Sequence, residues 1–184
     1  EGVRVQADEL TLAGVSLLNK RPSWIAKHGI AVVPERNKIF PSLTVEENLL
    51  ITAPRSAAAA LERAYGYFPA LKARRTSASG YLSGGERQML AIGRALLLEP
   101  ELLVADELSF GLSPAAVQTL VARLRTVSRE EKLAMLLAEQ SFDVAAVLAT
   151  DIYVFETGSV VAQGSTAELL DREDASVMLL GLRM

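Results

Sequence analysis

The chain has 184 residues, of which 50% are hydrophobic and 22% charged, so it is long enough to form one sizeable domain with a buried core. Its formal net charge of −3 reflects no excess of basic residues, which argues against a nucleic-acid-binding protein. The sequence contains no cysteine and a single histidine, His28, so disulfides, cysteine-ligated metals and sites built from several histidines are excluded.

The N-terminal part predicts short strands and one short helix. Residues 3–14 alternate apolar and polar side chains, which is typical of one or two strands at the edge of a sheet. A short helix is expected next, with Ser23 as its N-cap and Gly29 just beyond its C-terminus. The compact apolar run over residues 30–33 ends at a proline and predicts a buried strand.

Residues from about 42 to 80 are predicted to form a small helical subdomain. Ser42 or Thr44 can cap its first helix, because acidic residues follow in the first turn, where the helix dipole favours them. A second helix over residues 56–68 is expected to be interrupted at Gly66 and to be followed by a basic linker.

Strand and helix signals alternate from residue 81 onward, which favours a parallel sheet with helices on its faces. The apolar runs are interpreted as buried strands, and a glycine-containing turn joins the last two strands. In chain order the expected elements are a helix over 84–99, a strand over 102–107, a helix over 113–131, a strand over 133–140, a helix over 141–150, a hairpin over 151–164 and a helix over 165–173.

Two adjacent carboxylates end the predicted strand over residues 102–107. Asp106 and Glu107 would lie at the carboxyl edge of a parallel sheet, where the ligands of α/β proteins bind. One carboxylate can hold Mg²⁺, and its neighbour can polarise a water molecule for attack. A strand that simply ends in two solvated acids is the structural alternative for this pair.

Residues 82–86 read Leu-Ser-Gly-Gly-Glu and open the predicted helix over 84–99. The two glycines allow a backbone to approach another group closely, and the free N–H groups at a helix start can bind an anion. Ser83 adds a hydroxyl donor. Taken alone, the pentapeptide is also compatible with a glycine turn and an N-cap before a core helix.

Together, LSGGERQ at residues 82–88 and LLVADE at 102–107 resemble the signature motif and the Walker B strand of the ATP-binding cassette (ABC) ATPases. The segment 109–114 occupies the D-loop position. The resemblance implies an α/β fold, with a P-loop NTPase-like parallel sheet core and a helical subdomain, and a single partial ABC ATPase domain over residues 1–184. Its RecA-like core over 81–184 would carry the signature motif, Walker B strand, D-loop and switch region.

The resemblance also implies roles for individual residues. Glu107 and Gln140 would be catalytic, and Asp106 would hold Mg²⁺. Most family members have glutamine where this chain has Glu35 and histidine where it has Gln140, and Leu108 replaces the usual proline, which would loosen that turn. Glu35 would contact both Mg²⁺ and nucleotide, and the other nucleotide-binding residues implied are Ser83, Gly84, Gly85 and Glu86.

The segments around Glu35 and Gln140 most resemble the ATP-binding subunits of branched-chain amino-acid importers. This resemblance implies ATP and Mg²⁺ as cofactors and a second ABC ATPase subunit, in a homo- or heterodimer whose signature motifs act in trans. It further implies transmembrane permease subunits as partners, no nucleic acid, and a peripheral position at the cytoplasmic face of the inner or plasma membrane. A non-catalytic ABC-like regulatory or binding module is the alternative function.

No G-x-x-x-x-G-K-[S/T] occurs in the sequence, so the phosphate loop (Walker A) of the family is missing. We interpret the chain as N-terminally truncated just downstream of that loop, with natural loss of the loop as the alternative. Because phosphoryl transfer depends on positioning and electrostatics, the chain alone is expected to be inactive and to bind ATP at millimolar concentration or not at all.

Overall fold

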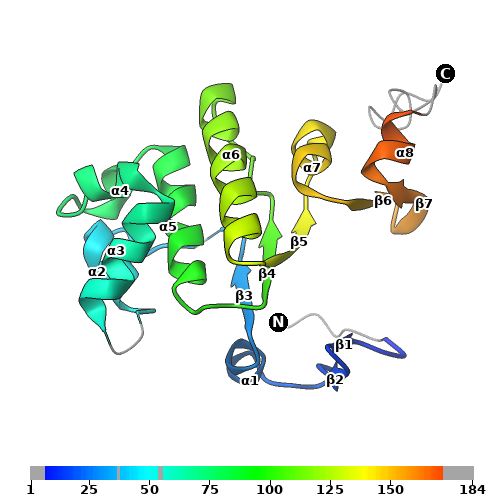
Figure 1. Cartoon of the computed structure of the whole chain (residues 1–184), viewed down its shortest axis with the longest axis horizontal. Helices are drawn as coiled ribbons and strands as arrows, with labels where there is room; N and C mark the ends of the chain where they lie inside the picture. The colour runs from blue at the N-terminus through cyan, green and yellow to red at the C-terminus, as the bar shows by residue number, and fades with distance from the viewer. Residues whose placement is uncertain (1–6, 37, 54–55, 172–184) are drawn as a thin grey trace.

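The computed structural model describes residues 7–36, 38–53 and 56–171 (Figure 1). Among these residues, a parallel sheet in the order β3-β4-β5 lies in the middle, and two antiparallel hairpins, β1-β2 and β6-β7, lie on either side of it in sequence. The strands are β1 (Thr11–Leu12), β2 (Val15–Ser16), β3 (Ile30–Val33), β4 (Leu102–Asp106), β5 (Ala134–Ala138), β6 (Asp151–Glu156) and β7 (Ser159–Ser165).

Helices fill the connections between these strands. Four of them, α2 to α5, gather on one side of the sheet, and α6 and α7 follow β4 and β5 in turn (Figure 1). The helices are α1 (Pro22–Lys27), α2 (Val45–Leu50), α3 (Ala57–Tyr67), α4 (Pro69–Ala73), the 3₁₀ helix η1 (Ser79–Tyr81), α5 (Gly84–Leu96), α6 (Pro114–Glu130), α7 (Phe142–Leu148) and α8 (Thr166–Leu170).

Several predicted helix ends are confirmed because their signals are local. The Thr44 hydroxyl accepts the Glu47 N–H at 3.1 Å, and the Glu47 carboxylate accepts the Thr44 N–H at 2.8 Å, which is a capping box. Ser113 caps α6 as predicted. Gly29, at φ +77°, follows the end of α1 in a conformation that side chains rarely adopt.

Other predicted boundaries are wrong. Helix α1 begins at Pro22 with Arg21 as its N-cap, so Ser23 is the second helical residue; the fixed φ of proline suits the first position. Gly66 does not interrupt α3, because buried residues on the same helix hold the backbone helical around it. The predicted basic linker begins as helix α4, which starts at Pro69.

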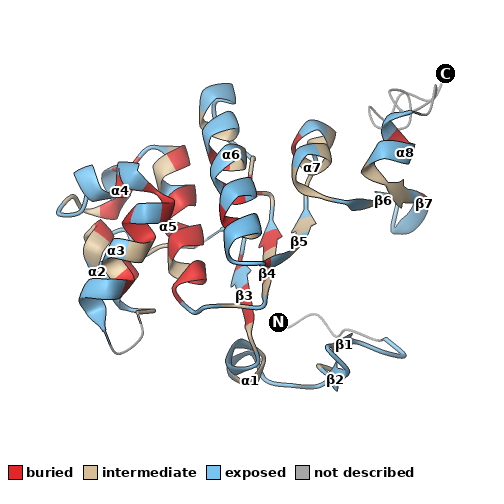
Figure 2. Cartoon of the chain, in the orientation of Figure 1, coloured by how far each residue is buried: buried red, intermediate tan, exposed pale blue. Residues whose placement is uncertain are grey.

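The core lies between one face of the parallel sheet and helices α5 and α6 (Figure 2). Sheet residues Ala31, Leu103 and Ala105 are almost fully buried and share one apolar cluster with Leu90 of α5 and Leu124 of α6. Burying a large aliphatic side chain contributes roughly 1.5–3 kcal/mol, so this cluster is the main source of stability for the sheet. Helices α2, α3 and α4 also contact α5, and the division at about residue 80 therefore remains a prediction.

The opposite face of the parallel sheet is largely bare in the described part of the chain. Val32, Val104 and Leu136 lie in register across the three strands, and Val32 and Leu136 are 60% and 61% exposed. The strand predicted over residues 133–140 is present as β5, but the prediction that it is buried is wrong, since β5 contains no buried residue. Strands with apolar residues on both faces are typical of a sheet that has helices packed on each side. In this structure the described helices pack on only one side of the sheet.

A polar cluster joins α3 to the end of α6. The Tyr67 hydroxyl and the Arg63 guanidinium both donate to the Glu131 carboxylate, the latter at 2.9 Å. The hydrogen bond from Tyr67 and the charge of Arg63 hold the pKa of Glu131 below its ordinary value of 4.5. Burial, with Glu131 nearby, raises the pKa of Tyr67 to about 12.

Glu131→Gln should reduce the acid sensitivity of the fold. The pKa of Glu131 is lower in the folded state than its ordinary value of 4.5. The stabilisation of the fold by ionised Glu131 is therefore complete above pH 4.5 and is lost as the pH falls through the folded-state pKa. Urea unfolding at about pH 7 and about pH 3.5 should show a smaller loss of stability for the variant than for the parent. At neutral pH the substitution should lower the free energy of unfolding by less than about 1 kcal/mol, because the ion pair between Arg63 and Glu131 is partly exposed. An identical pH dependence of both proteins would contradict this assignment.

Candidate functional site at the carboxyl edge of the sheet

Asp106 and Glu107 lie where strand β4 ends. Asp106 is the last residue of β4 and pairs with Ala138, and the Glu107 N–H donates to the Ala138 carbonyl at 2.9 Å. Glu107 has φ +49°, a left-handed conformation that is uncommon for a residue with a side chain and often occurs at functional sites. Leu108, which follows, is only 1% exposed and packs into the apolar core.

The structure brings the two predicted catalytic side chains together. The Gln140 amide donates a hydrogen bond to the Glu107 carboxylate across the ends of β4 and β5. An amide group carries two N–H bonds, so Gln140 retains one donor for a further ligand. The chain can therefore orient the Glu107 carboxylate without a histidine at this position.

The neighbouring Glu139 was not singled out by the sequence, and it has a clear structural role. Its carboxylate accepts the Ser109 N–H at 3.1 Å and the Ser109 hydroxyl at 2.7 Å. These two bonds fasten the start of the 109–114 segment to the end of β5. An acidic residue directly before Gln140 was the available signal, but the sequence alone does not show which loop it binds.

Asp106 offers a free carboxylate at this edge. The Asp106 side chain is exposed and makes no hydrogen bond or ion pair with any residue that the structure describes. Within the same part of the chain, no three histidine, cysteine, aspartate or glutamate side chains gather closely enough to enclose a metal ion. A single free carboxylate fits Mg²⁺, which usually keeps several water ligands and takes one or two protein carboxylates.

Glu35 is linked to Glu107 only through the charge of Arg36, and its side chain is not bonded to the other site residues. The Arg36 guanidinium donates to the Glu35 carboxylate at 2.9 Å, and the structure shows no direct bond from Glu35 to Asp106, Glu107 or Gln140 within the described ranges. The bond and charge of Glu35, and to a smaller extent the charge of Glu107, raise the pKa of Arg36. Arg36 therefore lies within electrostatic range of both carboxylates, a position that the sequence did not predict.

Helix α5 holds the segment that carries Glu35. The Lys38 ammonium donates to the side chain of Gln88, which is only 1% exposed, and Arg94 donates to the Lys38 carbonyl at 2.9 Å. The Arg94 guanidinium also lies 4.9 Å from the centre of the Phe40 ring. Burial lowers the pKa of both Lys38 and Arg94. Residues of α5 thus hold Lys38 and Phe40, which follow Glu35 in the chain.

A second anchor of the same segment is Asn48, a fully buried residue of α2. Its side-chain oxygen accepts the Phe40 N–H at 2.8 Å, and its NH₂ group donates to the Phe40 carbonyl at 3.0 Å. The NH₂ group also lies 3.1 Å from the Ser79 hydroxyl, which itself donates to the Phe40 carbonyl at 2.8 Å. One amide therefore joins the loop after β3 to the turn that precedes α5.

The Leu-Ser-Gly-Gly-Glu segment forms the start of α5. Ser83 is the N-cap, its hydroxyl accepts the Glu86 N–H at 3.2 Å, and the Glu86 carboxylate accepts the Ser83 N–H at 2.9 Å. The hydroxyl of Ser83 keeps its own proton available for donation to an anion. Glu86 serves the helix cap in this structure, and its predicted contact with nucleotide remains a prediction.

The two glycines of this segment allow close packing on the 109–116 region. A Cβ atom at Gly84 would lie 3.2 Å from Leu112, and one at Gly85 would lie 3.0 Å from the Cβ atom of Ala116 in α6. These approaches place the signature-like turn directly beside the D-loop-like segment. Within the described residues, no hydrogen bond or ion pair joins Ser83 or Glu86 to Glu107 or Gln140.

Gly85→Ala should destabilise the chain by about 1 kcal/mol, because the added methyl group overpacks the contact with Ala116. Gly66→Ala is the matched control: it lies within helix α3 with open space around it, so it should stabilise by about 0.5–1 kcal/mol. Urea unfolding monitored by circular dichroism gives both values. Adding Ala116→Gly to Gly85→Ala should recover part of the loss, and strictly additive effects would show that the two positions do not interact.

Comparison with known sequences supports the family resemblance of the two sequence motifs. Residues 2–109 match the sequence model of the ABC transporter family. The chain is 38% identical over 172 residues to the high-affinity branched-chain amino acid transport ATP-binding protein BraG of Pseudomonas aeruginosa, covering 91% of this chain and 73% of that protein. It is 33% identical over 182 residues to the probable branched-chain amino acid transport ATP-binding protein LivF of Archaeoglobus fulgidus, covering 97% and 77%.

Comparison with solved structures addresses the fold alone. The ADP conformation of MJ1267, an ATP-binding cassette of an ABC transporter, superimposes with a TM-score of 0.73 at 22% identity, covering 91% of this chain and 74% of that one. The ATP-binding cassette MJ0796, in a dimeric post-hydrolysis structure with ADP and Pi, gives a TM-score of 0.72 at 18% identity, covering 84% and 72%. The predicted α/β fold with a P-loop NTPase-like parallel sheet is confirmed.

Proposed function

Because the chain belongs to the ABC transporter family of ATP-binding proteins, we propose that it is the ATPase subunit of an importer for branched-chain or related amino acids. The observation that carries the proposal is the hydrogen bond from Gln140 to Glu107 at the carboxyl edge of β4 and β5. This edge is where parallel α/β sheets bind their ligands. The printed names of two relatives support the substrate class.

Glu107 is the general base in the proposed mechanism. Its carboxylate would accept a proton from the attacking water, and the Gln140 amide would hold the carboxylate in the required orientation. The second N–H of Gln140 is available to the phosphate. The partly exposed position of Glu107 leaves room for that water.

Asp106 and Ser83 would contact the nucleotide from two sides. Mg²⁺, when bound, neutralises charge on the phosphates, and the free carboxylate of Asp106 would hold it largely through water. Ser83, with the N–H groups of Gly84 and Gly85 at the start of α5, would donate to the γ-phosphate of a nucleotide bound by a second subunit. Glu35 would lie at the junction between nucleotide and Mg²⁺, with Arg36 balancing its charge.

The proposed assembly contains a second ABC ATPase subunit and transmembrane permease subunits. The chain would lie against the permease at the cytoplasmic face of the inner or plasma membrane, as a peripheral subunit. None of the helices in the described ranges has the length and hydropathy needed to cross a bilayer. Residues 42–80 would form the helical subdomain of this assembly, and residues 81–184 would form the catalytic core.

A non-catalytic ABC-like module is the second candidate function, favoured by the absence of a phosphate-loop motif from the 184 residues. Titration of the chain with Mg-ATP should show no binding tighter than about millimolar, since no lysine and backbone cradle holds the phosphates. Tight binding would overturn this interpretation of the missing motif.

A decisive test joins the loop-bearing N-terminal segment of an intact family member to Glu1 of this chain. The proposed ATPase function predicts that the joined protein both binds and hydrolyses Mg-ATP. Binding without hydrolysis would favour the non-catalytic module, and a folded protein that does neither would contradict both candidates. Circular dichroism of each protein controls for folding.

A further inference from the structure

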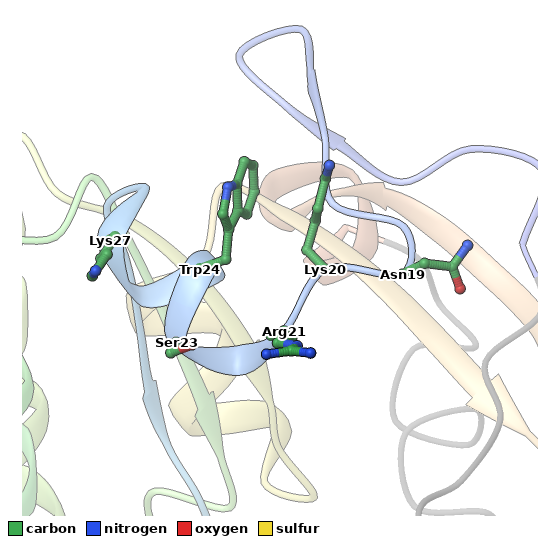
Figure 3. A pocket seen from close by; sticks show the side chains of 6 residues that line it. All are labelled: Asn19, Lys20, Arg21, Ser23, Trp24 and Lys27. Carbon is green, nitrogen blue, oxygen red and sulfur yellow. The ribbon is translucent and has the colours of Figure 1, made fainter.

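Helix α1 and the two residues before it carry a cluster of positive charges near the only tryptophan of the chain. The cluster lines a pocket of about 390 Å³ at the surface (Figure 3). The residues lining it, called here the α1 pocket, are Asn19, Lys20, Arg21, Ser23, Trp24 and Lys27. Half of these residues are basic and none is acidic.

Among the residues that the structure describes, no carboxylate pairs with the three basic side chains. Lys20, Arg21 and Lys27 are exposed and form no ion pair with any residue in the described ranges. Residues 10–34 contain no aspartate or glutamate, although the whole chain has a net charge of −3. Glu101 lies near the far end of α1, against Gly29, but does not line the pocket. The pocket is therefore a local concentration of uncompensated positive charge.

The indole ring of Trp24 gives the pocket a fixed wall. His28 stacks on the ring with 3.5 Å between the ring centres and an angle of 21°, and its Nδ1 lies 2.8 Å from the Trp24 carbonyl. The Lys20 ammonium lies 4.9 Å from the centre of the same ring. Asn19, at φ +58°, turns the chain so that Lys20 and Trp24 extend side by side (Figure 3).

The α1 pocket lies at the opposite end of the sheet from the candidate catalytic residues. Helix α1 leads directly into the first residue of β3, and β3 runs parallel to β4. Asp106 and Glu107 lie at the carboxyl end of β4, a strand about 17 Å long. A ligand held by α1 therefore occupies a different edge from the proposed catalytic site.

We propose that the α1 pocket binds ligands that carry two or more phosphate groups. Lys20 and Lys27 lie on either side of Trp24, and Arg21 lies at the beginning of the helix, so three positive charges border one pocket (Figure 3). One phosphate carries a charge of about −1.5 to −2 at neutral pH and matches only part of this cluster. The planar guanidinium of Arg21 suits two-point contact with phosphate oxygens, and the lysines act as flexible point charges. Several phosphates lie close together in soluble polyphosphates and also at the surface of an anionic membrane, where each headgroup supplies one phosphate.

The single tryptophan makes the test direct, because Trp24 emission reports only from this pocket. The complete 184-residue chain is titrated at constant ionic strength with tripolyphosphate, with phosphatidylglycerol vesicles and with phosphatidylcholine vesicles. A saturable change with tripolyphosphate alone identifies a soluble phosphate ligand, and a change with phosphatidylglycerol vesicles alone identifies headgroups. A change with both identifies the phosphate group itself as the recognised feature. No change with either probe, or an equal change with phosphatidylcholine, overturns the proposal.

Matched variants separate the pocket from general electrostatics. Lys20→Gln/Arg21→Gln/Lys27→Gln should weaken binding by about tenfold or more, because the charge-assisted contacts are lost. Arg123→Gln/Arg125→Gln/Arg129→Gln, which removes the same charge from exposed positions on α6, should change binding less than about twofold. Equal losses in both triple variants would overturn the proposal. Lys27→Gln alone provides a milder variant, and circular dichroism verifies its fold.

Discussion

Glu107→Gln lowers the rate of ATP hydrolysis by about 100- to 10,000-fold, the range expected for loss of a general base. The measurement uses this chain joined to the loop-bearing N-terminal segment of a family member, because the 184 residues contain no phosphate-loop motif. Glutamine has nearly the same shape as glutamate but cannot accept a proton from water. Gln140 can still hydrogen-bond to the oxygen of the new amide, so the local geometry is retained.

The binding of Mg-ATP separates catalysis from folding in this experiment. Glu107→Gln should bind Mg-ATP at least as tightly as the parent, since a negative charge near the phosphates is removed. Glu130→Gln, an exposed change on α6, is the matched control and should leave the rate within about twofold. A Glu107→Gln protein that hydrolyses ATP at the parental rate would exclude Glu107 as the base.

Asn48→Leu lowers the free energy of unfolding by about 3 kcal/mol, the second large effect expected for this chain. Leucine has a similar volume, but at this fully buried position it leaves the Phe40 N–H without its acceptor and removes the donor to the Phe40 carbonyl. Each buried polar group left unsatisfied costs about 1–3 kcal/mol, and part of the cost is offset because Ser79 still donates to that carbonyl. Urea unfolding monitored by circular dichroism measures the loss.

Gln118→Leu is the control for Asn48→Leu, because it removes an amide from an exposed position of α6. It should change stability by less than about 0.5 kcal/mol. A loss below about 1 kcal/mol for Asn48→Leu would show that the Asn48 network contributes no more than an ordinary surface contact. Hydrogen exchange of the Phe40 amide should accelerate in the variant if the network is locally important.

The sequence predicts those parts of the fold that depend on neighbouring residues. The caps Thr44, expected there with Ser42 as the alternative, and Ser113 could be predicted because their signals are adjacent in the chain: acidic residues in the first turn and Pro114 at the first helical position. Arg21 was missed as the cap of α1, since Pro22 and Ser23 are both acceptable near a helix start and the local signals compete.

Long-range contacts could not be predicted in the same way. Asn48 is an unremarkable amide in a helical segment, and its importance comes from Phe40 and Ser79, which lie 8 and 31 residues away. The resemblance predicted Glu107 and Gln140 as functional residues, but not that they bond to each other. Apolar strand residues do not reveal whether one or both faces of a sheet are covered. The exposure of Leu136 could therefore not be predicted from the sequence.

Helix α5 is a rigid connection between the Ser83 turn and Lys38. It carries Ser83 at its N-terminus, and within its length of about 20 Å it also holds Lys38 through Gln88 and Arg94. A hydrogen-bonded helix resists bending over so short a span, so a displacement of Lys38 is expected to be passed to the Ser83 turn. In the proposed ATPase, a phosphate bound at Ser83 would in this way act on the position of Lys38, without any change in the fold between them.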